Sequence, residues 1–307
     1  MTAFVQFPHP GAEHCPESDD MPWNIGRHGR KFLVSDGRYV DADGRRREGE
    51  VVFWGEWEPP SHVERRWPRD GRLPRVLHRP YWTRGRGQNT DPWVFGDRMR
   101  YSNCKQALGD ARKATSMQRL SPGSVICFGS RLDHEFRVDT VFVVADARPW
   151  TPAESADLDE DEAFKACTAE PMAAGADAGT SFTLYRAATF EKPVDGMYSF
   201  VPTKPADGEG SRFARPALRM PDLINPASWQ STRGSKQPLA EAEVRSAWNT
   251  VREQVFQAGL VLATHLKTPD RSANAPESEA VGGGCSPVNE LDCSSRAGSV
   301  TKRPCTA

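Results

Sequence analysis

The sequence predicts an α+β protein built on a curved, mainly antiparallel sheet or a small barrel, with two principal helices and a disordered C-terminal tail. Short runs rich in Val, Ile, Phe and Thr are separated by Gly and Pro turn signals. Amphipathic helical patterns occur at 103–118 and 239–258, without the regular strand-helix alternation of a parallel fold. Beyond residue 267 the apolar content is too low for a core.

Residues 1–150 form an aromatic-rich and arginine-rich unit that holds seven of the nine tryptophans. Strands are predicted at 51–57, 124–129 and 137–144, and the last two form a hairpin that follows a Pro-Gly turn. The helix at 103–118 keeps Cys104 and other small apolar residues on one stripe, which favours a buried cysteine. This first unit is therefore mostly β, with one helix.

The rest of the chain divides into three parts. Residues 151–180 are acidic and weakly patterned, which indicates a flexible insertion. Residues 181–266 continue the same globular unit with strands at 181–190 and 195–202 and the helix at 239–258, which Gly259 ends. Residues 267–307 are predicted to be a disordered tail. The buried stripe of the second helix is Val244, Trp248, Val251 and Val255.

Charge is unevenly spread, although the formal net charge is only −1. Residues 27–119 hold 21 Lys and Arg against 12 Asp and Glu, and 154–178 hold eight acids and one lysine. Arginine suits bidentate phosphate contacts, so an anionic partner of the first half is one interpretation. A solvated basic face balanced by an acidic loop is the other.

Several classes of protein are disfavoured. The seven cysteines include no C-x-x-C pair, which argues against a zinc ribbon and a disulfide framework and suits a reducing cytosol. There is no export signal, no apolar run long enough for a membrane helix, and no dinucleotide or P-loop glycine motif. We expect a cytoplasmic protein that does not bind a membrane and uses no cofactor.

The stretch VVFWGEWEPPSH at 51–62 is the first candidate for chemistry. In an extended strand Trp54, Glu56 and Glu58 share one face and Trp57 lies on the other. Carboxylates two residues apart are separated by about 7 Å, which is near the spacing used in inverting glycoside hydrolysis. An indole beside them could stack on a sugar or base. The alternative is a strand with one solvated, glutamate-bearing face.

Two N-terminal segments carry further candidates. In FPHPGAEH at 7–14, His14 or Glu13 could act as an acid or base, while Pro10-Gly11 disfavours the helix that a metal motif needs, so no metal site is predicted. The segment 21–34 combines an aromatic ring, an amide and cations, which is typical of base stacking, base-edge contacts and phosphate contacts. Its candidate ligand-binding residues are Trp23, Asn24, Arg27, His28 and Arg30. A surface hairpin with a core tryptophan is the alternative.

The segment 89–106 runs into the first predicted helix, whose N-terminus would favour an anion such as phosphate. Ordinary capping by a serine or asparagine is the alternative. The candidate ligand-binding residues here are Arg98, Arg100, Tyr101, Ser102, Asn103 and Lys105.

Residues 120–146, LSPGSVICFGSRLDHEFRVDTVFVVAD, resemble small β-barrel modules of the PUA and ASCH type. In those modules a Pro-Gly-Asp turn leads into a strand, a variable loop and a strand rich in Val and Thr, and Ser124 here replaces the Asp. The resemblance implies a PUA-like barrel and an RNA, DNA or modified-nucleotide ligand in its cleft. It assigns no catalytic residues.

Three functions remain open on the sequence. The first is a protein that binds a base and its phosphate, from a nucleic acid or a nucleotide, through an aromatic and arginine-rich cleft. The second is an enzyme that cleaves or modifies a nucleotide, nucleoside or glycosidic linkage, with Glu56, Glu58 and a histidine such as His14 as acid/base groups. The third is an interaction protein with no small-molecule site. The first two predict that the same segments meet at one site.

Overall fold

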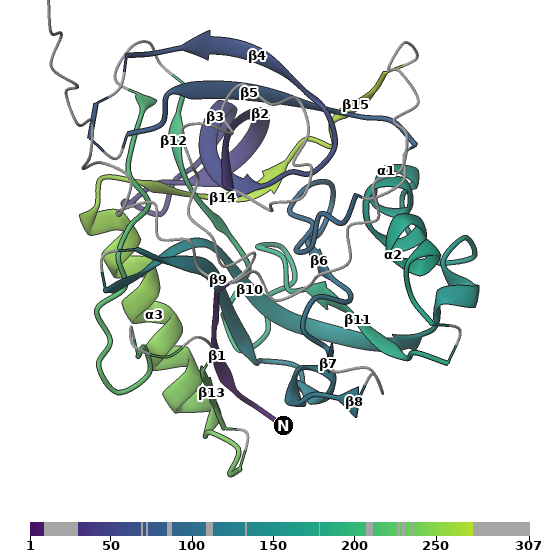
Figure 1. Ribbon diagram of the computed structural model, residues 1–307. Helices are drawn as coiled ribbons and strands as arrows, with labels where there is room; N and C mark the ends of the chain where they lie inside the picture. The colour runs from purple at the N-terminus through teal and green to yellow at the C-terminus, as the bar shows by residue number, and fades with distance from the viewer. Residues whose placement is uncertain are drawn as a thin grey trace, which may run out of the picture.

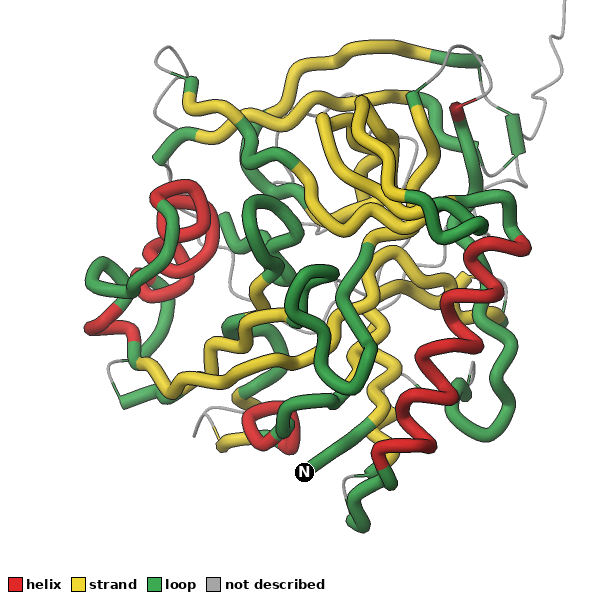
Figure 2. Tube along the Cα trace, turned by 180° about the vertical axis from the view of Figure 1, so that it is seen from behind, coloured by secondary structure: helices red, strands yellow, loops and turns green. Residues whose placement is uncertain are grey.

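The computed structural model describes residues 1–272 except 9–29, 69, 72, 85–87, 109–112, 133, 178, 207–210, 226, 227, 229, 230 and 235. Two large sheets make up most of this part of the chain, and helices pack at its sides (Figure 1). Figure 2 shows the same predominance of strand from behind. The predicted α+β class with a mainly antiparallel sheet is confirmed.

The first sheet has the strand order β13 (Ser231–Arg233), β1 (Phe4–Pro8), β9 (Val125–Leu132), β10 (Glu135–Trp150), β11 (Phe182–Ala187) and β6 (Arg100–Tyr101). Only β1 and β9 run parallel within it. The predicted hairpin is the β9–β10 pair, and both strands are longer than the sequence pattern indicated. A register shift between Val138 and Thr140 marks a bulge at Asp139.

The second sheet has the order β14 (Val261–Leu266), β12 (Val201–Pro205), β3 (Arg46–Glu56), β2 (Arg30–Val40), β5 (Val76–Trp82) and β15 (Asp270–Arg271), and β4 (Ser61–Arg66) pairs with β5. Strand β14 pairs with both β12 and β2, so the sheet curls back on itself. A third, two-stranded sheet joins β7 (Ala107–Leu108) to β8 (Lys113–Ala114).

Strands β1, β9 and the second half of β3 are buried on both faces, which explains why they are apolar at successive positions. In β3, Phe53 and the following Trp57 belong to an inner cluster, whereas Val52 and Trp54 belong to a second cluster beneath the long helix α3 (Glu241–Gln257). The predicted alternation of the two tryptophans is therefore confirmed. The face that carries Trp54 is packed and does not meet water, because Trp54 is only 4% exposed.

Helix α3 is the second helix that the sequence predicted. Its buried residues include the whole predicted stripe, Val244, Trp248, Val251 and Val255, together with Ala247. The Trp248 indole donates a hydrogen bond to the carbonyl of Tyr198, 3.0 Å away. Gly259 follows the helix with φ of 73°, a left-handed conformation that suits a residue without Cβ.

The helix predicted at 103–118 is wrong. This stretch contains β7, β8 and a 3-10 turn at Ser116–Arg119. Lys105 has φ of 56°, which interrupts helical geometry, and the Gln106 side chain bonds the backbone N–H and C=O of Thr183 at 2.7 and 2.8 Å. Tertiary hydrogen bonds thus override the helical spacing of the apolar residues.

The acidic stretch 151–180 was expected to be a flexible insertion. It contains a 3-10 turn at Pro152–Glu154, then α1 (Glu162–Phe164), a π-helical segment (Lys165–Ala169) and α2 (Glu170–Ala174). Phe164 and Cys167 are fully buried in the inner cluster. All residues of 163–169 except Lys165 are buried, and this run was too short for the sequence to reveal.

At the C-terminal side, β15 lies within the predicted tail of 267–307, and residues 273–307 lie outside the described part of the chain. Across the described residues, none of the helices combines the length and apolarity needed to cross a membrane.

Candidate functional site

A buried polar centre lies at the edge of the inner cluster. Its anchor is the Asp91 carboxylate, which accepts hydrogen bonds from three successive backbone N–H groups: Ser102 at 2.8 Å, Asn103 at 3.0 Å and Cys104 at 2.8 Å. Burial raises the pKa of the Asp91 carboxyl, and these backbone hydrogen bonds oppose the shift. The anion site that the sequence predicted at 101–105 is therefore filled by a carboxylate of the protein itself.

Two asparagines extend the polar centre. Asn89 and Asn103 exchange side-chain hydrogen bonds of 2.9 and 3.1 Å, so their amides form a reciprocal pair. The remaining amide protons reach Cys104 Sγ at 3.3 Å and Ser102 Oγ at 2.8 Å. The thiol of Cys104 is buried, as the sequence predicted.

Glu58 connects this centre to the end of β3. Its carboxylate accepts a short hydrogen bond from the Asn89 backbone N–H, and its own N–H donates to Thr90 Oγ1 at 3.2 Å. Lys105, from the other side, donates to the carbonyl of Pro8 at 2.5 Å and lies 5.0 Å from the centre of the Phe7 ring. We call Glu58, Asn89, Asp91, Ser102, Asn103 and Cys104 the polar centre.

Lys31 is a buried residue of β2. Its side chain is 2% exposed, and among the described residues its Nζ has no hydrogen-bond partner. Burial lowers the pKa of Lys31 to about 7. Lys31 is opposite Gly55 in the β2–β3 register, three residues before Glu58. The buried Gln88, which precedes Asn89 in the sequence, also has a side-chain oxygen, Oε1, with no partner in the described part of the chain.

The same face of the sheet carries a histidine. His78 of β5 is opposite Leu33 of β2 in a parallel pair, so its side chain shares a face with Lys31, two residues earlier. His78 Nδ1 and Ser61 Oγ are 3.0 Å apart, and both side chains are buried. Lys31 and His78 thus lie on one face of the second sheet.

Glu56 belongs to a different cluster of buried charges. Arg30 ion-pairs with Asp139 over a short contact, donates to the carbonyl of Gly129 at 3.2 Å and lies 3.7 Å from Glu56. Arg215 lies 3.4 Å from the same Asp139 carboxylate. Glu56 and Glu58 therefore turn to different partners, because β3 ends at Glu56 and strand alternation does not extend to Glu58.

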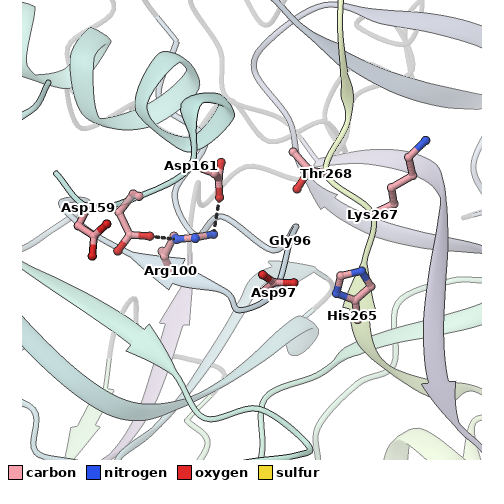
Figure 3. Close-up of a pocket in the computed structure, with 9 residues that line it drawn as sticks. Gly96, Asp97, Arg100, Asp159, Asp161, His265, Lys267 and Thr268 are labelled. Atoms are coloured by element: carbon pink, nitrogen blue, oxygen red, sulfur yellow. Dashed lines mark hydrogen bonds and ion pairs between the residues drawn. The ribbon is translucent and has the colours of Figure 1, made fainter. Parts of the chain in front are cut away.

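A pocket of about 560 Å³ lies beside the polar segment 93–101 (Figure 3). Arg100 is in its wall and binds Asp161 at 2.9 Å and Glu160 through a shorter contact. Asp97 and His265 face the pocket from the other side, whereas the ammonium of Lys267 points away from Asp97 (Figure 3). Four acids line the pocket, namely Asp97, Asp159, Glu160 and Asp161. This acidic wall disfavours phosphate and suits a neutral or cationic group.

The titration of His265 follows from the same surroundings. Burial lowers the pKa of His265, and the positive charge of Arg38 adds to the shift while Asp97 opposes it. Within the described residues, no group of three or more His, Cys, Asp or Glu is arranged to hold a metal ion.

The predicted site residues are thus divided among several places. Arg98 lies 3.5 Å from Asp146 in an ion pair, and Arg100 is held by acids. Tyr101 is buried and donates to the carbonyl of Cys104 at 2.6 Å, and Trp54 donates to the carbonyl of Phe213 at 2.8 Å. His14, Trp23, Asn24, Arg27 and His28 lie outside the described residues.

Sequence reasoning missed His78, Asn89 and Asp91 as individual site residues. Asn89 and Asp91 lie in the candidate segment 89–106, and His78 lies in LHRPYW at 77–82, which is also dense in polar and aromatic residues. Lys31 belongs to the candidate segment 21–34, whose cations were predicted to contact phosphate.

We expect Asp91→Ala to lower the free energy of unfolding by about 3 kcal/mol, taking about 1 kcal/mol for each backbone hydrogen bond that loses its acceptor. Urea denaturation followed by tryptophan fluorescence measures the change. Asp41→Ala is the matched control, since Asp41 also accepts two backbone N–H bonds, from Asp43 at 3.1 Å and Arg45 at 2.9 Å, in an exposed turn. Equal losses in the two variants would contradict the anchoring role of Asp91.

Comparison with protein-family models, curated proteins and solved structures finds no significant match to this chain.

Proposed function

We propose that this protein binds a nucleotide or a base of a nucleic acid at the polar centre and the adjoining Lys31. The supporting observation is convergence: residues far apart in the chain, at 58, 89–91 and 102–104, meet through the hydrogen bonds of Glu58, Asn89 and Asp91, and Lys31 is opposite Gly55, three residues before Glu58. Segments with polar and charged side chains that meet at one buried place are typical of a ligand site built on a rigid scaffold.

The chemistry of the proposed ligand follows from the buried groups with no described hydrogen-bond partner. Buried polar groups are almost always hydrogen-bonded, so the Lys31 amine and the Gln88 side-chain oxygen indicate a partner from outside the described residues. A nucleobase presents carbonyl or ring-nitrogen acceptors to such an amine and amino donors to such an oxygen. Phosphate contacts by Arg98 and Arg100 are not part of this proposal, because both guanidiniums are paired with acids.

The resemblance of residues 120–146 to PUA and ASCH modules supports the same ligand class. On the same resemblance we also propose that the β9–β10 hairpin belongs to a PUA-like barrel.

Binding to a panel of nucleosides, 5′-mononucleotides and short oligonucleotides, followed by isothermal titration calorimetry, tests the function. We expect Lys31→Met to weaken the best ligand of the panel roughly tenfold or more, the effect of losing one hydrogen bond to a charged group. Lys113→Met, at an exposed lysine of β8, is the matched control. A protein that binds no member of the panel, or a Lys31→Met variant that binds as well as the control, would refute the proposal.

An enzyme acting on a nucleotide, nucleoside or glycosidic linkage is the second candidate. The observation that favours it is the Lys31 amine, whose pKa of about 7 leaves much of it neutral and able to accept a proton or attack a carbon near pH 7. Glu58 keeps its proposed acid/base role, whereas Glu56 is engaged by Arg30. Chromatographic product analysis with wild type, Lys31→Met and Glu58→Gln separates turnover from binding.

A further inference from the structure

The strand pair β4–β5 forms an edge of the second sheet and is exposed on its outer side. Strand β4 is paired only with β5 in the described part of the chain, and five of its six residues are exposed. It lies at one end of the molecule, remote from α3, in both views (Figures 1 and 2). Its Val63, 41% exposed, is the only exposed large apolar side chain among the described residues.

This edge is strongly basic. Residues 61–84 contain seven arginines against two acids, Glu64 and Asp70. Some of that charge is neutralised within the protein: Arg79 pairs with Glu50 at 2.7 Å and also with Glu64, Arg84 pairs with Glu162 at 2.6 Å and also with Glu170, and Arg212 lies 3.6 Å from Asp70. No described carboxylate pairs with Arg65, which is exposed on β4. The exposed guanidinium of Arg65 therefore remains as positive charge on this surface.

Aromatic rings alternate with the arginines. The His62 and Tyr81 rings are stacked, with centroids 4.4 Å apart. The guanidinium groups of Arg65 and Arg212 lie 5.8 and 5.3 Å from the Trp67 ring centre, one from β4 and one from a distant part of the chain. Arginines held against aromatic faces beside a basic strand are the combination used to contact a nucleic-acid backbone and its bases.

The local geometry disfavours the other usual partner of a sheet edge, an added β-strand. The β4–β5 register shifts between Val63 and Arg65, which marks a bulge, and the strand is charged at successive positions. Bulges and charges are the devices that prevent edge-to-edge pairing. Electrostatic complementarity therefore favours a polyanion over a peptide strand.

The basic edge is also continuous with the polar centre. Strand β4 begins at Ser61, three residues after Glu58, and Ser61 contacts His78 on the face that carries Lys31. A chain that follows the arginines of β4 would reach the polar centre at the start of the strand.

We infer that the outer face of β4–β5, with Arg65 and the Trp67 ring, binds the phosphate backbone of a nucleic-acid chain whose base enters the polar centre. The inference rests on the proposed function and narrows it, because the partner is then a nucleic-acid chain and not a free nucleotide.

Fluorescence anisotropy with labelled 20-nucleotide single strands and duplexes, over a series of salt concentrations, tests this surface, with calorimetric binding of 5′-mononucleotides in parallel. The test variant is the double charge reversal Arg65→Glu, Arg66→Glu. The matched control is Arg148→Glu, Arg245→Glu, which makes the same charge change at exposed arginines of β10 and α3. We expect the test variant, and not the control, to weaken oligonucleotide binding at least tenfold.

The salt dependence gives a second, independent readout. Each lost phosphate contact lowers the slope of log K against log salt by about 0.7 for single strands, so the test variant should lose at least about 0.7, the contact of Arg65. Mononucleotide affinity should not change. Control circular dichroism spectra and melting curves of the two variants establish that both remain folded.

Each other outcome is decisive. Oligonucleotide affinity that is equal in the two variants, or a wild type that binds mononucleotides only, overturns the inference and leaves the proposed function standing. Equal competition by heparin overturns it as well, because the surface would then recognise any polyanion. Oligonucleotide binding that depends on Arg65 and Arg66 but not on Lys31 supports this surface and refutes the proposed base site. A wild type that binds neither refutes both.

Discussion

Lys31→Met is expected to raise the free energy of unfolding by about 4 to 5 kcal/mol at pH 7 and below, because burial lowers the pKa of Lys31 from 10.5 to about 7. Between about pH 7 and pH 10.5 the Lys31 amine is protonated in the unfolded chain and neutral in the folded chain. Stability therefore rises with pH across that interval, and the penalty is complete below pH 7 and absent above about pH 10.5. Methionine has a similar shape and no charge, so the variant lacks the penalty.

Urea denaturation of wild type and Lys31→Met at several pH values from 6 to 10 measures this difference, which should shrink as the pH rises. Lys113→Met serves again as the exposed control and should show no such trend. A stability difference that is small, or constant over this range, would contradict a lowered pKa. A buried amine that lowers the stability of the fold is typical of a residue that is kept for function.

Asp139→Ala is expected to lower the free energy of unfolding by about 3 to 5 kcal/mol, because it leaves the buried guanidinium groups of Arg30 and Arg215 without their shared carboxylate. The bulge in β10 places Asp139 between the two arginines. Gly129 allows the backbone of Arg137 to lie close to the neighbouring strand, because a Cβ at Gly129 would be 2.1 Å from the carbonyl oxygen of Arg137. The cluster therefore depends on backbone geometry as well as on charge.

Asp146→Ala is the control on the same strand. Asp146 is 47% exposed in its side chain and lies 3.5 Å from Arg98 and 3.8 Å from Arg186, so its loss should be below about 1 kcal/mol. Thermal and urea unfolding of the two variants compares a buried and an exposed carboxylate in the same strand. An Asp139→Ala loss no larger than that of Asp146→Ala would show that Glu56 or water compensates the two arginines.

Much of the secondary structure could be predicted because its signals are local. The stripe of Val244, Trp248, Val251 and Val255 repeats over several turns, and Gly259 marks the helix end, so α3 was found nearly to the residue. The hairpin β9–β10 follows a Pro-Gly turn and alternates in the expected way. The prediction of a helix at 103–118 was wrong because long-range hydrogen bonds, above all those of Asp91 and Gln106, outweigh the helical periodicity of this stretch.

The sequence indicated which segments contribute to the candidate site, but not which individual residues do. Polar and aromatic density identified 51–62 and 89–106, but the roles assigned to individual residues depended on which side chains face one another. Glu56 and Glu58 are two residues apart and have different partners, Arg30 and Asn89. Arg98 and Arg100, predicted to bind phosphate, are neutralised by acids from 146 and 160–161 that are distant in sequence.

The sequence by itself determined the α+β class, the long helix, and the division of Trp54 and Trp57 between opposite faces, since all of these follow from periodicity and local propensity. Only the tertiary structure decided which charged groups are paired within the protein and which are available to a ligand. Asp91 fills the predicted anion site, and Lys31 is buried with no described hydrogen-bond partner. The physical reason is that desolvation and pairing depend on neighbours brought together from distant parts of the chain, and a one-dimensional pattern carries no record of them.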